Sequence, residues 1–149
     1  MNAIELLKAD HQKVRDLFGR FQEKGGIKIN DPIVRSITQE LRVHTILEEE
    51  LFYPAVREMN DEKLQELVEE SLDDHQSVKE MIDEIEEGAM SDEELSEHMA
   101  MLQEDLETHL EQEETEMFPR LQKIWQEDYL DRLGTGMMDR KQRIQARAA

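Results

Sequence analysis

The chain has 149 residues, a length typical of one domain with a full hydrophobic core, and it contains no cysteine. The missing cysteines exclude disulfide scaffolds, zinc fingers, thiolate-bound iron–sulfur clusters and cysteine nucleophiles, and they favour a cytoplasmic location. With 37 acidic and 18 basic side chains the formal net charge is -19, which opposes contact with nucleic acid or an anionic membrane. Since no apolar stretch approaches the roughly 18 residues of a membrane span, we expect a soluble protein.

Apolar residues recur at helical spacing in four long segments, which predicts an all-α protein. Glycine, proline and polar capping residues mark the segment ends. The first segment covers residues 3–24 before Gly25-Gly26, the second starts at Asn30 or Asp31 before Pro32, the third lies between Asn60-Asp61 and Gly88, and the fourth starts at the capping box Ser91-Asp92-Glu93-Glu94. Because the connections are short, the helices must be antiparallel neighbours, which predicts an up-down-up-down four-helix bundle.

Two features interrupt the helical pattern. Pro54 and Pro119 lie within the second and fourth segments, where each is expected to kink its helix or end it early. Further on, Gly134-Thr135-Gly136 is expected to break the pattern, and four basic residues outnumber Asp139 in the rest of the chain. We therefore divide the chain into a helical bundle at residues 1–133 and a basic, flexible tail at residues 134–149.

Two short motifs occur twice, once in each half of the chain. Asp10-His11-Gln12 recurs as Asp74-His75-Gln76, at an offset of 64 residues. A run of histidine, two glutamates and proline, from His44 to Pro54, recurs at the same internal spacings from His109 to Pro119, at an offset of 65 residues. Each half of the chain is therefore interpreted as a helical hairpin that carries one copy of each motif.

Six ionisable groups fall on or beside the apolar stripes that should face the core: His11, His44, Glu48, His75, His109 and Glu113. A histidine and a glutamate four residues apart share one helix face, and reflection of the four histidines about the connecting loops places them at one depth in the bundle. Burying these groups uncompensated would cost several kcal/mol for each charge. Because imidazole and carboxylate are metal ligands, we predict a binuclear metal site formed by all six.

The alternative is a buried network of hydrogen bonds and ion pairs, in which Arg15 and Lys79 point toward the same layer from four residues after His11 and His75. His98 is expected to be solvated or hydrogen-bonded, because it lies about 16 Å along the helix from His109. Tyr53 either faces the site or sits at the Pro54 bend, and the second placement is favoured.

At these residues the sequence resembles the hemerythrin-like proteins of the histidine-histidine-glutamate (HHE) cation-binding group, over about residues 3–125. The resemblance implies a four-helix bundle with a non-heme di-iron centre and an oxo or hydroxo bridge. By motif, His11 and His44 would ligate one iron, His75 and His109 the other, and Glu48 and Glu113 would bridge. Oxygen-carrying members have a further histidine where this chain has Lys79, so a more open coordination sphere is implied here.

The resemblance implies a cytoplasmic di-iron protein that binds dioxygen or a related small diatomic ligand for storage, delivery or sensing. The second hypothesis is an oxidase- or peroxidase-like enzyme at the same centre, with a nitric-oxide or iron-stress response as a variant. The third is a metal-free helical interaction module whose basic tail docks on an acidic partner. Iron follows from the resemblance alone, because nitrogen and oxygen ligands also accept manganese or zinc.

Overall fold

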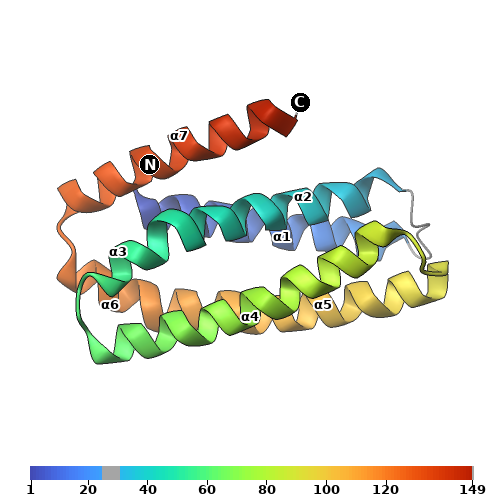
Figure 1. Cartoon of the computed structure of the whole chain (residues 1–149), viewed down its shortest axis with the longest axis horizontal. Helices are drawn as coiled ribbons and strands as arrows, with labels where there is room; N and C mark the ends of the chain where they lie inside the picture. Colours follow the sequence, from blue (N-terminus) through green and yellow to red (C-terminus); the bar gives the residue numbers. More distant parts are fainter. Residues whose placement is uncertain (25–30, 149) are drawn as a thin grey trace.

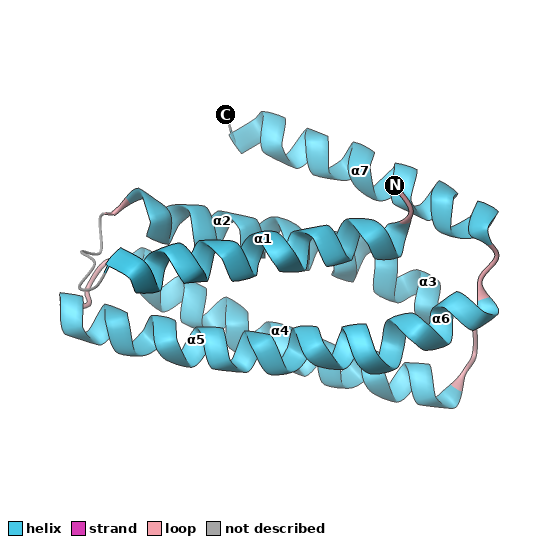
Figure 2. Cartoon of the chain, turned by 180° about the vertical axis from the view of Figure 1, so that it is seen from behind, coloured by secondary structure: helices cyan, strands magenta, loops and turns pink. Residues whose placement is uncertain are grey.

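The computed structural model describes residues 1–24 and 31–148, and over this range the chain is helical, with no strand (Figures 1 and 2). Within the same range no helix has the length and apolar character needed to cross a membrane. The elements in chain order are α1 (Ala3–Lys24), α2 (Pro32–Leu47), the π-helix η1 (Glu48–Phe52), α3 (Tyr53–Arg57), α4 (Glu62–Glu87), α5 (Asp92–Gln112), the π-helix η2 (Glu113–Met117), α6 (Phe118–Ile124) and α7 (Glu127–Ala148).

The predicted capping residues define most helix ends. The side chain of Asp31 accepts a hydrogen bond from the N–H of Ile33 at 3.0 Å, just before Pro32. Ser91 and Glu94 form the reciprocal capping box of α5, and Gly88 ends α4 with a φ of 71°, in the left-handed region that favours glycine. The expected stop at Gly25-Gly26 and the alternative cap Asn30 lie outside the described residues.

Pro54 and Pro119 change the helix type at equivalent points of the two halves. A proline lacks the N–H of a helical hydrogen bond, and its ring crowds the carbonyl four residues before it. The chain responds with a π-turn, in which the N–H of Tyr53 bonds to the carbonyl of Glu48 and the N–H of Phe118 to that of Glu113. The prediction that each proline ends or kinks its helix is confirmed. Each π-turn begins at the glutamate of the repeated histidine–glutamate motif.

The long helices α1, α2, α4 and α5 run along one another, with α1 beside α2 and α4 beside α5 (Figures 1 and 2). Their buried apolar side chains form two separate clusters. Along α1, for example, Leu7 belongs to one cluster, Val14 to the other, and His11 lies between them; along α2, Leu41 and Leu47 flank His44 in the same way. The candidate site therefore lies between two apolar regions, which keep water away from both sides of it.

The prediction for the C-terminal residues is wrong in one respect: Gly134-Thr135-Gly136 does not break a helix, and the boundary proposed at residue 133 falls inside α7. This helix lies along α1 and α2, with Met137 fully buried (Figures 1 and 2). The physical reason is a close approach, because a Cβ atom at Gly134 would lie 2.5 Å from the backbone oxygen of Met1 and 2.7 Å from the backbone nitrogen of Ala3. Glycine at this position lets α7 cross the start of α1.

Gly134 and Gly136 form a matched pair of test sites for this docking. We expect Gly134→Ala to lower the free energy of unfolding by roughly 1–3 kcal/mol, because the added methyl group meets backbone atoms that cannot move away easily. Gly136→Ala should instead raise it by up to about 1 kcal/mol, because a methyl group there meets nothing within 4 Å and alanine is the better helix former. Urea unfolding measures both, and equal effects of the two substitutions would contradict the docking of α7 at Gly134.

Candidate metal centre

The six residues singled out by the sequence are all buried and come from both halves of the chain. His11 lies on α1, His44 on α2, Glu48 at the start of η1, His75 on α4, His109 on α5 and Glu113 at the start of η2. The structure thus brings together, in the interior, four imidazoles and two carboxylates that are far apart in the sequence.

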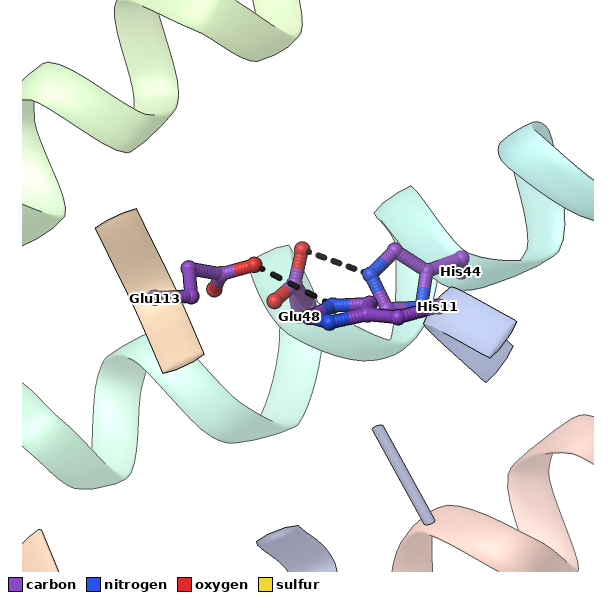
Figure 3. Close-up of side chains that lie close together, drawn as sticks. All are labelled: His11, His44, Glu48 and Glu113. Atoms are coloured by element: carbon purple, nitrogen blue, oxygen red, sulfur yellow. Dashed lines mark ion pairs between the residues drawn. The ribbon is translucent and has the colours of Figure 1, made fainter. Parts of the chain in front are cut away.

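Two overlapping groups of potential ligand atoms make up the site. In the first group, one atom each from His11, His44, Glu48 and Glu113 lie within 4.8 Å of one another (Figure 3). The Nε2 atom of His44 is 3.1 Å from Oε1 of Glu48, and Nε2 of His11 is 3.4 Å from Oε1 of Glu113. The side chains point toward one another, as a shared ion would require.

The second group contains Glu48, His75 and His109. Oε1 of Glu48 is 3.0 Å from Nε2 of His75, and Oε1 of Glu113 is 3.2 Å from Nε2 of His109. Each glutamate therefore lies between one histidine of the first half and one of the second. This placement is compatible with the predicted binuclear site.

Unpartnered atoms in this space test whether a metal fits. Five buried polar atoms of the site lack a hydrogen-bond partner among the described residues: Nε2 of His11, His44 and His109, Oε2 of Glu48 and Oε1 of Glu113. Nε2 of His11 and Nε2 of His109 both lie near Oε1 of Glu113, but neither contact has the orientation of a hydrogen bond. Buried polar groups are rarely left without a partner, and these are the nitrogen and oxygen types that coordinate cations. The residues present therefore fit a metal site.

Every histidine of the site is held from outside by a carboxylate at Nδ1. The contacts are His11 with Glu114 at 2.8 Å, His44 with Asp10 at 3.2 Å, His75 with Glu49 at 2.9 Å and His109 with Asp74 at 3.2 Å. We call Asp10, Glu49, Asp74 and Glu114 the outer carboxylates. With Nδ1–H donating to an outer carboxylate, the lone pair of Nε2 faces inward, which is the usual arrangement for a histidine that ligates a metal.

Sequence reasoning missed the outer carboxylates, although their signal was present in the repeated motifs. Asp10 and Asp74 directly precede a histidine of the site, and each holds the other histidine of its own half. Glu49 and Glu114 directly follow a glutamate of the site, and each reaches across to a histidine of the opposite half. The first duplicated motif thus contains one inner and one outer residue, and the second contains two inner residues and one outer carboxylate.

The buried-network alternative expected Arg15 and Lys79 to point into the space between the six residues. In the structure neither side chain does so. Arg15 bonds Glu114 at 2.9 Å and Lys79 bonds Glu49 at 2.8 Å, so both cations stand behind outer carboxylates. The hydrogen bond from His11, together with Arg15, lowers the pKa of Glu114 to about 2. Among the described residues, Glu48 and Glu113 have histidines but no lysine or arginine within ion-pair distance.

In the metal-free protein the histidines must balance Glu48 and Glu113. Burial lowers the pKa of His44, but Glu48 and Asp10 more than offset this effect and raise it to about 10. The pKa of His109 is also raised: burial opposes the shift, and Glu113 and Asp74 cause it. Protonated imidazoles therefore neutralise the buried carboxylates when no cation is present.

This balance predicts a pH dependence of the metal-free protein. A histidine whose pKa is raised by folding contributes stability in full below its unfolded value of about 6.5, and this contribution is lost as the pH rises through the folded value. We expect the free energy of unfolding of chelator-treated protein to fall by at least about 1 kcal/mol between roughly pH 6.5 and pH 10. Urea unfolding across this range measures it, and constant or rising stability would contradict the charge balance.

Tyr53 is part of the site, so the expectation that it merely sits at the Pro54 bend is incomplete. Its buried hydroxyl donates a hydrogen bond to Oε2 of Glu113 at 3.0 Å and lies 3.3 Å from Nε2 of His75. Burial raises the pKa of Tyr53, and Glu113 and Glu48 raise it further, so the phenol keeps its proton. His98, as expected, is hydrogen-bonded elsewhere, with Nδ1 2.8 Å from the carbonyl of Glu94.

The interior of this helical protein gathers imidazoles and carboxylates from different helices, and an outer carboxylate holds each imidazole. These features define a helical protein with a histidine–glutamate metal site. The chain belongs to the hemerythrin family, since the family model described as "Hemerythrin HHE cation binding domain" matches residues 2–121. All six site residues lie within this match.

One curated relative is a protein of Nostoc sp. named "DNA nickase", which is 26% identical over 148 residues. These residues cover 99% of this chain but 41% of the relative, so the chain spans less than half of that protein. No solved structure matches the chain.

Proposed function

We propose that the chain is a non-heme di-iron protein that binds dioxygen or a related small diatomic ligand, for storage, delivery or sensing. In this proposal His11 and His44 would hold one iron, His75 and His109 would hold the other, and Glu48 and Glu113 would be shared between them, within an up-down-up-down four-helix bundle. The observation that carries the proposal is the set of five inward-facing atoms that have no partner among the described residues. The family match supports a cation at this place.

When bound, iron would supply open coordination positions and accessible electrons for a small ligand. The chain's own groups prepare the site for it. The outer carboxylates hold the Nδ1 protons and so fix the orientation of the imidazole rings. Buried side chains such as Leu7, Leu47, Val78 and Met117 belong to the apolar clusters that exclude water from either side.

A second candidate function, an oxidase- or peroxidase-like activity, is favoured by Tyr53. Its buried hydroxyl donates a hydrogen bond to Glu113 and lies beside Nε2 of His75. A hydroxyl that keeps its proton here can donate a hydrogen bond to the negative charge that develops on an oxidant as it is reduced, which suits turnover. Peroxide consumption that falls in Tyr53→Phe while iron content is retained would favour the enzyme.

Iron loading followed by metal analysis and absorption spectroscopy tests the leading proposal. A reversible binder should hold two iron ions for each chain and change its absorption spectrum when dioxygen is admitted and removed, without consuming peroxide. Fewer than about one ion for each chain would favour the metal-free interaction module. Two ion pairs speak against that module, because Arg140 and Lys141 of its docking tail already pair with Glu50 and Asp10 of the same chain.

The DNA-directed activity in the name of the Nostoc relative is not part of this proposal. A net charge of -19 opposes contact with phosphate backbones, and more than half of that relative lies outside the matched region.

A further inference from the structure

A lysine from α7 reaches the surroundings of the site. Nζ of Lys141 lies 2.7 Å from Oδ1 of Asp10, and the other oxygen of Asp10 receives Nδ1 of His44 at 3.2 Å. Lys141 is therefore connected to a residue of the site through one carboxylate. It belongs to an element that begins at Glu127, after the end of the family match at residue 121.

Comparison of the four outer carboxylates shows what Lys141 adds. Glu114 is backed by Arg15 and Glu49 by Lys79, both from the helices that carry the site. Asp10 is backed by Lys141 of α7, and its side chain is only 4% exposed. Asp74, the equivalent of Asp10 in the second half, is 47% exposed and has no cation against it among residues 1–24 and 31–148.

A carboxylate that is bonded at both oxygens has little freedom to rotate, so it holds the imidazole bonded to it more rigidly. The ion pair of Lys141 and Asp10 is largely shielded, with 16% and 4% of the two side chains exposed, and solvent therefore screens it less than a surface pair. The ring of His44 is thus fixed through Asp10, whereas the ring of His109 depends on an open aspartate.

We propose that Lys141 is a positioning residue of the metal centre: by fixing Asp10 and thereby His44, it makes α7 a clamp that slows the release of the ion held by His11 and His44. The inference rests on the proposed binuclear site. It assigns to the C-terminal helix a role in metal retention at one of the two positions, while the position of His75 and His109 lies outside its influence.

Release of cobalt(II), a spectroscopic probe bound in place of iron, tests this role. Protein loaded with two cobalt ions for each chain is mixed with excess chelator, and the visible cobalt absorption is followed with time. We expect Lys141→Met to accelerate release of one ion by roughly tenfold, the lower end of the effect seen when a partner of a metal ligand is removed. Release of the other ion should not change, and Lys141→Arg should restore the slow rate.

Arg140→Met is the matched control. Arg140 precedes Lys141 in α7 and bonds Glu50 at 2.9 Å, but Glu50 holds no histidine of the site. Its loss should therefore leave both release rates unchanged. Equal acceleration of both ions by Lys141→Met, no acceleration at all, or the same effect from Arg140→Met would overturn the proposed clamp.

A second measurement on metal-free protein separates this inference from the proposed function. Nitrogen-15 NMR of the imidazoles should show a change at Nδ1 of His44 in Lys141→Met, with His109 and the Arg140→Met spectrum unaffected. If wild-type protein takes up no cobalt but this change is present, the binuclear proposal fails, while the connection of Lys141 through Asp10 to His44 stands. An unchanged His44 signal would overturn the role of Lys141 regardless of metal binding.

Discussion

Replacing His44 or His109 with alanine is expected to abolish binding of two metal ions for each chain. Each histidine presents an unpartnered Nε2 to the site, and each contacts one of the two glutamates that lie between the histidines of the two halves. Removing a ligand should cost more than removing a residue that supports one, for which losses of about 10- to 100-fold in affinity are typical. We therefore expect at least about a hundredfold loss, measured as metal content after dialysis against a weak chelator.

His98→Ala is the control for this experiment. His98 lies on the same helix as His109, but its Nδ1 meets the carbonyl of Glu94 and its Nε2 lies 3.3 Å from Glu84. Metal content should stay at the wild-type level in His98→Ala. If the His44 and His109 variants also keep two ions for each chain, the assignment of the site residues is wrong.

Removal of the metal is expected to lower the melting temperature by roughly 10 °C. A ligand that binds only the folded state stabilises it by about 4 kcal/mol when its free concentration is a thousand times its dissociation constant. For a domain of this size, each kcal/mol corresponds to roughly 2–4 °C. Calorimetry of iron-loaded and chelator-treated protein near neutral pH measures the difference.

The same comparison in His44→Ala provides the control, because a variant without the site should melt at the same temperature with and without iron. A wild-type protein that melts at one temperature in both states would show that the ions do not hold the buried imidazoles and carboxylates together.

The helices and the inner residues of the site could be predicted because their signals are local. Helical periodicity, Pro32, Gly88 and the capping box at Ser91 are read within a few residues of the chain. The histidine and glutamate of each repeated motif also share a helix face whatever their neighbours do.

The outer carboxylates could not be singled out in the same way. The chain has 37 acidic residues, and which of them reaches a given histidine depends on how the helices lie against one another. Glu114, for example, meets His11, which is 103 residues away in the sequence. Tyr53 was misjudged for the same reason, because the direction of its hydroxyl depends on the π-turn that ends at Phe52.

The C-terminal helix was mispredicted because a glycine has two opposite uses. Glycine destabilises an isolated helix, which is why Gly134-Thr135-Gly136 suggested a break. In the structure Gly134 instead permits contact with the backbone of Met1, and the stability of α7 comes from that docking, with Leu130 and Met137 buried, and from the shielded ion pair of Lys141. Three of the four basic residues that suggested a free tail, Arg140, Lys141 and Arg143, are partners of acidic residues in the same chain.

Anomalous X-ray diffraction at the iron absorption edge, from crystals of the iron-loaded protein, tests the central claim most directly. The account predicts two anomalous peaks in the protein interior, one beside Nε2 of His11 and His44 and the other beside Nε2 of His75 and His109, with Glu48 and Glu113 between them. A map in which this space holds only protein and water, or in which iron lies elsewhere on the chain, would contradict it.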